Sequence, residues 1–375
     1  MFATTSPEFG RALADLARTN PDLLGLSAPA DATVRIQGQG ESYVAWRLGV
    51  PTAALPESVR AAGAEALVVR APARPVETLP HAATAEFRAL ELAPPGIGPV
   101  PVRLVAVADS PFGVPLLIQS LVPGRVLPDF AWTGELLTAH AHQLAELHSR
   151  RYSGHGAIGP DGVTDADLSP VMDPLDFLDG SLQYWERTRP DLLRDTAAGR
   201  LSTSARTYVE ASRPAFESVP FALLQGDAAP LNILVHEGTP RYIDWEWTSI
   251  GDPARDLGLL GAAEGASPWY ITLDDRREEH LLRAYLEAGG GAGVDDLERL
   301  RTRRRVHEVM EQLFTATHFL SRLHPVGRAV VVDGRVVEPG ADTPAVPVPE
   351  QKRGIYERAV ATMFRAVAAR LGDQS

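Results

Sequence analysis

Apolar residues follow two different periods along the chain. In the first third they form short alternating or continuous runs, and afterwards they recur mostly every three to four residues. The first pattern is typical of strands, and the second is typical of helices with one buried face. Strands are therefore predicted at residues 34–36, 43–48, 66–70, 102–108 and 114–119, and helices at 6–20, 81–92, 133–148, 173–188, 199–217, 275–288, 296–320 and 353–371.

Two segments interrupt the helical part of the chain. Residues 221–247 form a compact strand-rich island, and a valine-rich hairpin is predicted at 328–338, with its turn at Asp333-Gly334. Together the patterns predict an α+β fold with two lobes and a cleft between them. The predicted β-rich N-terminal lobe spans 1–118, a hinge spans 119–124, and the mainly helical C-terminal lobe spans 125–375.

Composition and charge exclude several classes of function. The 375 residues are 45% hydrophobic and 22% charged, which is ordinary for a globular protein. A net charge of -12, from 36 basic and 48 acidic residues, argues against a general nucleic-acid binder. The absence of cysteine removes disulfides and zinc-thiolate sites. With no apolar run long enough to span a bilayer and no signal peptide evident, we expect a soluble cytoplasmic protein with no membrane partner.

Polar residues stand where the short strands of the island end. Asp227 follows an apolar strand and a glycine, Asn232 opens the next strand, and Asp244 ends the returning one. The hairpin connection predicts these three side chains at the same end of one small sheet. Carboxylate and amide oxygens suit Mg²⁺, which keeps coordination positions for substrate phosphates. With a metal on Asn232 and Asp244, Asp227 is free to accept a proton from an incoming hydroxyl.

Three motifs follow one another in this island. They are G-D-x-x-x-x-N at 226–232, I-D-W-E at 243–246 and G-D-P-x-x-D-L at 251–257. This order resembles the aminoglycoside phosphotransferase family of small-molecule kinases, and the resemblance implies the protein-kinase-like fold shared with choline kinases and macrolide phosphotransferases. It also implies ATP or GTP as phosphate donor, a small-molecule hydroxyl as acceptor, Asp227 as catalytic base, and Mg²⁺ held by Asn232 and Asp244.

The resemblance extends into the N-terminal lobe. The glycine-rich turn at 38–42 resembles the loop that covers the phosphates, and the strand at 66–70 resembles the one that carries a phosphate-binding cation. The helix at 81–92 contains the glutamate that pairs with this cation, and 117–124 resembles the hinge that holds adenine. The implied nucleotide site comprises Gly38, Gly40, Ser42, Arg70, Glu86 and the backbone of Gln119 and Leu121.

Two residues depart from the family's pattern. Gln225 stands where the family usually has histidine, and the strand cation is Arg70 in a chain whose single lysine is Lys352. Glutamine also donates and accepts hydrogen bonds, and arginine binds phosphate bidentately, so both changes are compatible with activity. They also motivate the alternative of a catalytically silent kinase-like protein that binds a nucleotide or another ligand.

Several other residues have a structural interpretation beside the functional one. Asp252 is predicted to stand at a helix start, and Asp256 to stabilise the first turn of that helix or the catalytic loop. His148 is predicted to be a packed or capping histidine. Glu246 is either a surface residue or part of the acceptor pocket. The tryptophans are either core residues or walls of an apolar acceptor pocket. The sequence defines neither the acceptor nor the oligomeric state.

Overall fold

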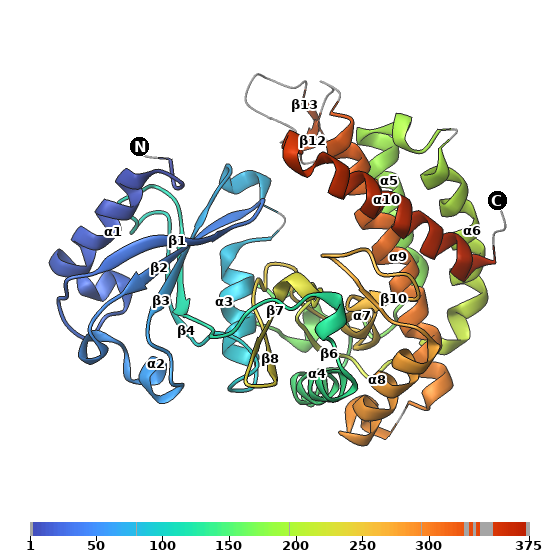
Figure 1. Cartoon of the computed structure of the whole chain (residues 1–375), viewed down its shortest axis with the longest axis horizontal. Helices are drawn as coiled ribbons and strands as arrows, with labels where there is room; N and C mark the ends of the chain where they lie inside the picture. The colour runs from blue at the N-terminus through green and yellow to red at the C-terminus, as the bar shows by residue number, and fades with distance from the viewer. Residues whose placement is uncertain are drawn as a thin grey trace.

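A computed structural model gives the fold of the chain (Figure 1). It describes residues 3–79, 81–194, 196–293, 295–325, 330–332, 335–337 and 348–372. Strands and short helices form one side of the molecule, and long helices form most of the other. The predicted α+β fold with two lobes is confirmed, whereas the boundaries 1–118, 119–124 and 125–375 stay a prediction.

The N-terminal lobe is built on one antiparallel sheet with the strand order β1-β2-β3-β5-β4. Its strands alternate buried and exposed side chains in part, and β3 and β5 are buried throughout because they occupy the middle. The Ser6 hydroxyl accepts a hydrogen bond from the N–H of Phe9 and so caps the first helix, whose Phe9 packs against Trp46. The elements are α1 (Pro7–Thr19), β1 (Thr33–Gln39), β2 (Tyr43–Gly49), α2 (Glu57–Ala61), β3 (Leu67–Pro72), α3 (Ala83–Leu92), β4 (Pro101–Val105) and β5 (Leu116–Ser120).

The C-terminal lobe packs helices around α9, its longest helix in the described part of the chain. This helix contacts α6, α7 and α10, and most of its length is buried. Its helices are α4 (Gly134–Leu147), α5 (Pro174–Thr188), α6 (Ala197–Ser212), α7 (Ala254–Gly258), α8 (Asp275–Glu287), α9 (Leu297–Leu323) and α10 (Glu350–Leu371). Its strands are β6 (Ala222–Leu224), β7 (Ile233–His236), β8 (Thr239–Tyr242), β9 (Ser249–Gly251), β10 (Gly261–Ala262), β11 (Ile271–Thr272), β12 (Val330–Val332) and β13 (Arg335–Val337).

The island at 221–247 differs from its prediction. Strand β6 does not share a sheet with the β7–β8 hairpin; it pairs with β9, a strand that the apolar pattern does not reveal. The expectation that Asp227, Asn232 and Asp244 lie at the end of one small sheet is therefore wrong, since they border two separate sheets. The hairpin at 328–338 is confirmed by the pairing of β12 with β13, and its turn at Asp333-Gly334 lies outside the described residues.

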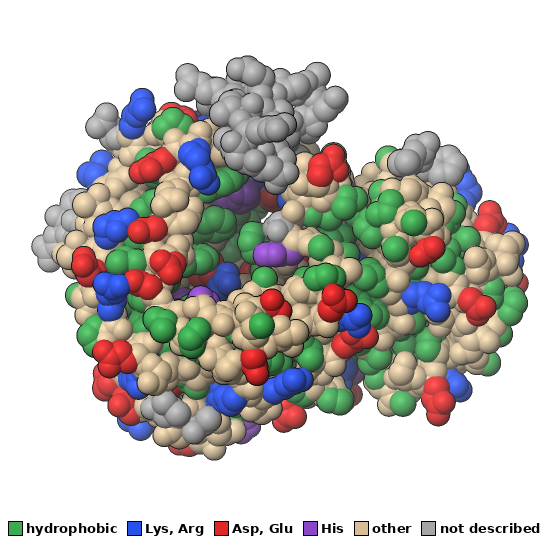
Figure 2. Space-filling model, turned by 180° about the vertical axis from the view of Figure 1, so that it is seen from behind, with side chains coloured by type: hydrophobic (Ala, Val, Ile, Leu, Met, Phe, Trp, Pro, Cys, Tyr) green, Lys and Arg blue, Asp and Glu red, His purple; other side chains and the backbone are tan. Residues whose placement is uncertain are grey.

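The surface mixes charges of both signs. Figure 2 shows acidic and basic side chains interspersed over the face seen from behind, with no extended basic patch on that face. Among the described residues, no helix is long and apolar enough to cross a membrane.

Candidate active site

A glycine directs the chain out of β6 toward the candidate base. Gly226 has φ +84°, and a Cβ atom there would lie 1.9 Å from the carbonyl oxygen of Trp247. Only glycine fits this turn, because other residues meet both backbone strain and a steric clash. The turn places Asp227 directly after the buried end of β6, as the sequence predicts.

Asp256 fixes the backbone of this turn through hydrogen bonds. Its two carboxylate oxygens accept hydrogen bonds from the backbone N–H groups of Gln225 and Gly226, at 2.8 and 2.9 Å. His148 Nε2 lies 3.2 Å from the same carboxylate, and its Nδ1 lies 3.0 Å from the hydroxyl of Tyr285. All of these side chains are buried, so the predictions that Asp256 stabilises the catalytic loop and that His148 is a packed histidine are confirmed.

Gln225 joins the loop of Asp227 to the loop of Asp244. Its Oε1 accepts a hydrogen bond from the backbone N–H of Asp227 at 2.7 Å. Its Nε2 donates to the carbonyl oxygens of Ile243 and Asp244, at 3.0 and 2.9 Å. The glutamine therefore uses both ends of its amide to fix the spacing between the two carboxylates, a role that a fully buried side chain performs without competition from water.

Asn232 completes the junction between the two loops. Its Nδ2 donates to the carboxylate of Asp227 at 2.7 Å and to the Asp227 carbonyl oxygen at 3.0 Å. Its own carbonyl oxygen accepts a hydrogen bond from the N–H of Ile243, which brings Asp244 alongside. The structure thus assembles Asp227, Asn232 and Asp244 as the sequence predicts, through hydrogen bonds between loops rather than through one sheet.

Arg70 reaches this junction from β3 of the other lobe. Its guanidinium binds the carboxylate of Glu86 on α3 and, at 2.5 Å, Oδ1 of Asp244. The guanidinium also lies over the ring of Tyr43, 4.7 Å from its centroid. Burial acts to lower the pKa of Arg70, but Asp244 and Glu86 outweigh it and raise that pKa. The predicted pairing of Arg70 with Glu86 is present, and it is a buried pair rather than a surface one.

Several acidic side chains lie close together where the two lobes meet. Burial raises the pKa of Glu86 to about 7 and that of Glu246 to about 7, and the neighbouring Asp244 contributes to both shifts. Burial also raises the pKa of Asp227 well above its usual range, with Asp244 as the next cause. Arg70, Arg74 and Arg255 each act to lower one or more of these pKa values but do not outweigh burial, so the site favours an additional cation.

Glu246 lies on the side of this site that faces the N-terminal lobe. It lies beside Asp244 and Arg70, and the hydroxyl of Ser42 in the glycine-rich turn lowers its pKa through a hydrogen bond. Its Oε2 is buried and has no hydrogen-bond partner within the described part of the chain. The sequence left this residue between two interpretations, because the chain between β8 and β9 has no regular period from which to read its direction.

The glycine-rich turn links β1 to β2 above these residues. A Cβ atom at Gly38 would meet no atom within 4 Å, and one at Gly40 would lie 3.7 Å from the carbonyl oxygen of Tyr43. Neither glycine is thus required by packing within the protein. Ser42 is buried, and its carbonyl oxygen accepts a hydrogen bond from the N–H of Ala73. The phosphate-covering role of Gly38, Gly40 and Ser42 stays a prediction.

The hinge segment continues from the end of β5. Gln119 stands opposite Val68 of β3 and Pro101 of β4 in the register of the sheet. The backbone N–H of Leu121 donates to the carbonyl oxygen of Ala66 at 2.9 Å. The N–H of Leu121 would therefore have to break its hydrogen bond to Ala66 before it could donate to adenine. The adenine-binding role of Gln119 and Leu121 stays a prediction.

The residues present fit a magnesium ion. The Nδ2 of Asn232 donates to Asp227, so the side-chain oxygen of Asn232 is the atom that would bind the metal. Asp244 binds Arg70 through Oδ1 and has a second oxygen, Oδ2, to offer as a ligand. Asp244 adopts φ +61°, a strained conformation typical of functional positions. No group of three or more His, Cys, Asp or Glu among the described residues is arranged to hold a metal. Magnesium needs fewer protein ligands when substrate phosphates complete its shell.

Comparison with known proteins agrees with this geometry. A sequence profile of the phosphotransferase enzyme family matches residues 57–303, more than half of the chain. The chain belongs to this family. Viomycin phosphotransferase of Streptomyces vinaceus is 28% identical over 211 residues, which cover 53% of this chain and 63% of that protein. The aligned part is thus less than two thirds of the relative's length.

Two solved structures show the same fold. A choline/ethanolamine kinase family protein from Mesorhizobium loti has a TM-score of 0.53 and 17% identity, covering 96% of this chain and 98% of its own. A thermostable mutant of aminoglycoside phosphotransferase APH(4)-Ia, in a ternary complex with AMP-PNP and hygromycin B, has a TM-score of 0.51 and 15% identity, covering 93% and 96%. These likenesses confirm the protein-kinase-like fold that the motif order implies.

Replacing Gln225 tests whether it sets the spacing of the two loops in this phosphotransferase family member. Gln225→Leu removes three hydrogen bonds, so we expect phosphoryl transfer to fall about 10- to 100-fold, as when residues behind metal ligands are lost. Gln225→His keeps polar atoms at the position, and we expect it to retain more activity than the leucine variant. The measurement is steady-state transfer together with thermal unfolding. Equal activity of the wild type and Gln225→Leu would contradict the role.

Proposed function

We propose that the protein is a Mg²⁺-dependent kinase that transfers the γ-phosphoryl group of ATP or GTP to a hydroxyl of a small molecule. The observation that carries this proposal is the meeting of Asp227, Asn232 and Asp244 opposite the buried pair of Arg70 and Glu86. A base, two oxygen ligands and an oriented cation are the parts that phosphoryl transfer requires, because positioning and charge neutralisation supply most of its catalysis.

Asp227 is the catalytic base of this proposal. Its carboxylate accepts the proton of the acceptor hydroxyl while that oxygen forms a bond to the γ-phosphorus. The bond from the γ-phosphorus to the oxygen bridging it to the β-phosphorus breaks, and the nucleoside diphosphate leaves. Burial raises the pKa of Asp227, which makes its carboxylate a better proton acceptor. Asn232 orients that carboxylate through a hydrogen bond of 2.7 Å.

The remaining residues bind the nucleotide. Arg70, oriented by Glu86, contacts the phosphates, and the turn containing Gly38, Gly40 and Ser42 covers them. Asn232 and Asp244 would hold Mg²⁺, whose charge would neutralise the phosphates when it is bound. The acidic side chains that lie close together where the two lobes meet support the need for this cation. Adenine or guanine would lie against the hinge at Gln119 and Leu121.

The acceptor site is proposed on the side of the C-terminal lobe that faces Asp227. Arg255 and Glu311 form an ion pair of 2.6 Å, and both change the pKa of Asp227. The Arg255 guanidinium lies 5.3 Å from the ring centroid of Phe177, and the hydroxyl of Tyr270 lies 3.0 Å from that of Thr315. These residues supply aromatic rings, hydroxyl groups, one positive side chain and one negative side chain. Such a set suits an acceptor that bears hydroxyl and amino groups.

The first experiment is a calorimetric titration with ATP and with GTP, each with and without Mg²⁺. We expect Mg²⁺-dependent binding of at least one nucleotide. Release of the nucleoside diphosphate is then measured with viomycin, hygromycin B, streptomycin, choline and ethanolamine as acceptors, since these occur in the names of relatives or of their complexes. A folded protein that binds neither nucleotide would favour the alternative of a catalytically silent kinase-like protein.

Asp244→Ala tests the metal ligand. Removing a carboxylate that would bind Mg²⁺ directly is expected to weaken binding of the Mg²⁺-nucleotide by about 10-fold or more, with a smaller effect on the metal-free nucleotide. The comparison between titrations with and without Mg²⁺ separates metal binding from the loss of the Arg70 contact, because Arg70 is released in both. An unchanged affinity with Mg²⁺ would exclude Asp244 as a ligand.

A further inference from the structure

One face of α9 runs along the cleft between the lobes. Glu311, Thr315, His318 and Arg322 are spaced by four, three and four residues, so they lie on the same side of the helix. Glu311 pairs with Arg255 near Asp227, and Thr315 contacts the hydroxyl of Tyr270 in the same lobe. His318 and Arg322 both contact Glu41 of the other lobe. Glu311 and Arg322 are eleven residue steps apart, about 16 Å along the helix at 1.5 Å per residue. A single rigid element thus extends from the catalytic base toward the opposite lobe.

The far end of this face contacts the glycine-rich turn. The carboxylate of Glu41, at the tip of the turn, forms an ion pair with Arg322 and lies 3.4 Å from Nε2 of His318. These residues are separated by 277 or more positions in the sequence. Burial acts to raise the pKa of Glu41, but His318 and Arg322 outweigh it and lower that pKa. The carboxylate is therefore held in its charged form by the helix.

The cation of this contact is fixed by its surroundings. The guanidinium of Arg322 lies 5.3 Å from the ring centroid of Tyr356 on α10, and its Nη1 lies 3.3 Å from the Tyr356 hydroxyl. Tyr356 in turn packs against Trp269 and Phe319, with ring centroids 4.9 and 4.7 Å away. The side chain of Arg322 is 12% exposed, against 46% for Glu41. The helix side of the contact is therefore more extensively packed than the turn side.

The base of the turn is held within the N-terminal lobe, and Glu41 lies at its tip. Gly38 and Gly40 contribute no side chain, and added Cβ atoms there would meet open space or a single distant atom. The base of the turn is fixed by the β1–β2 ladder, in which Gly38 pairs with Ala45 and Gln39 with Val44. The N–H of Gly40 also donates to the carbonyl oxygen of Tyr43 at 2.9 Å. Ser42 anchors its far end through the N–H of Ala73, and Glu41 supplies the contacts between the tip of the turn and α9.

We propose that Glu41 is a positioning residue that docks the phosphate-covering turn onto α9, through Arg322 and His318, and so links the turn to the acceptor side of the cleft. This inference rests on the proposed kinase function for its effect on nucleotide binding, but not for the contact itself. Because the same helix face holds Arg255 through Glu311, a shift of α9 caused by the acceptor would move the turn as well.

Hydrogen exchange and nucleotide titration test the proposal together. The variants are Glu41→Gln, Arg322→Gln and the double variant, and Glu65→Gln, which loses an ion pair to Arg47 within the N-terminal lobe, is the matched control. We expect faster exchange of the backbone amides of 38–44 in both single variants and no further increase in the double variant. For Mg²⁺-ATP we expect about two- to fivefold weaker binding, since the pair is partly exposed, and a smaller difference at high salt. The control should match the wild type.

The outcomes separate this proposal from the proposed function. Unchanged exchange at 38–44 in Glu41→Gln, with the fold intact by thermal unfolding, would overturn the docking role whatever the nucleotide does. Additive effects of the two substitutions on exchange would overturn it as well, because a shared contact predicts non-additivity. Failure of the wild type to bind ATP or GTP would instead count against the kinase function. The hydrogen-exchange comparison would still test whether Glu41 docks the turn onto α9, because it does not need a nucleotide.

Discussion

Asp227→Asn is expected to lower the rate of phosphoryl transfer by about 10²- to 10⁴-fold, the contribution typical of a general base. Asparagine keeps an oxygen that accepts the hydrogen bond from Asn232 Nδ2, so the junction of the two loops should persist. It cannot take up a proton from the acceptor hydroxyl. Binding of the Mg²⁺-nucleotide should change little, because Asp227 is not assigned to the metal or to the phosphates.

The measurement is single-turnover transfer to the acceptor found in the screen, beside calorimetric titration with the Mg²⁺-nucleotide. Asp161→Asn, an exposed position of the same lobe, is the matched control and should behave as the wild type. Loss of nucleotide binding in parallel with transfer would reassign Asp227 to the binding site. Retention of transfer within a few fold would exclude it as the base.

The architecture could be read from the sequence because its signals are local. The period of apolar residues gave the helices, whose observed bounds lie within a few residues of those predicted, as for α8 (Asp275–Glu287) and α9 (Leu297–Leu323). Capping residues such as Ser6 and Thr133 mark the starts of α1 and α4 by accepting a backbone hydrogen bond. The order of the three motifs at 226–257 then implied that these elements form the two lobes of a protein-kinase-like fold.

The assembly of the site was only partly predictable. The spacing of Asp227 and Asn232 keeps them in one loop, but the partner strand of β6 is β9, which has only three residues, and such a short segment carries no periodic signal. The roles of Gln225 and Glu246 depend on the direction of side chains in loops without a repeat. Long-range contacts such as that of Glu41 with Arg322 leave no pattern in a single sequence, because each residue looks like an ordinary surface charge.

Buried charges in the C-terminal lobe give the largest expected effect on stability. Arg303 on α9 is buried and donates to Asp252 Oδ2 at 3.0 Å and to both carboxylate oxygens of Asp295, at 2.6 and 2.7 Å. Asp252 and Asp295 are buried as well, and His307 Nε2 lies 3.0 Å from Asp252. The guanidinium therefore neutralises two carboxylates that have almost no access to water, and one of them, Asp252, belongs to the G-D-P-x-x-D-L motif.

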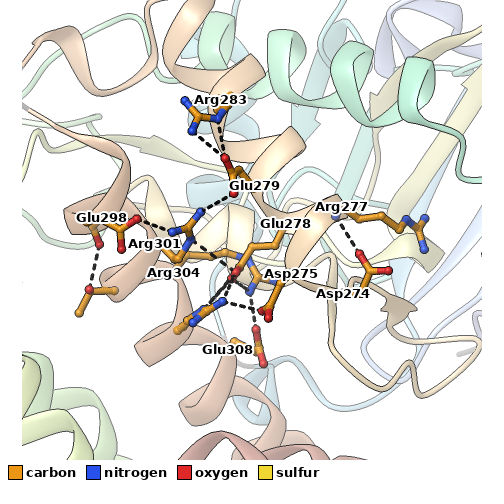
Figure 3. Close-up of polar contacts among 12 residues, drawn as sticks. Asp274, Asp275, Arg277, Glu278, Glu279, Arg283, Glu298, Arg301, Arg304 and Glu308 are labelled. Carbon is orange, nitrogen blue, oxygen red and sulfur yellow. Dashed lines mark hydrogen bonds and ion pairs between the residues drawn. The ribbon is translucent and has the colours of Figure 1, made fainter.

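Arg303→Met is expected to lower the free energy of unfolding by about 3–5 kcal/mol, because it leaves buried carboxylates without their partner. Arg283→Met is the matched control: Arg283 pairs with Glu279 on the exposed surface of α8, near the buried Arg304–Glu278 pair (Figure 3). The control should change the free energy by less than about 0.5 kcal/mol. Chemical denaturation at neutral pH measures both variants.

The pH dependence shows whether charge or packing causes the loss. Burial acts to raise the pKa of Asp252, but Arg303 and His307 outweigh it and hold that pKa well below its usual range. A carboxylate with a lowered pKa stabilises the fold above its unfolded pKa of about 3.9, and this contribution is lost as the pH falls. The difference between the wild type and Arg303→Met should therefore be full at pH 7 and shrink from about pH 5 downward. Adding Asp295→Asn to Arg303→Met should recover part of the stability at pH 7, since it removes an unpaired buried charge. A difference that stays constant from pH 7 to pH 3, with no recovery in the double variant, would assign the loss to packing instead.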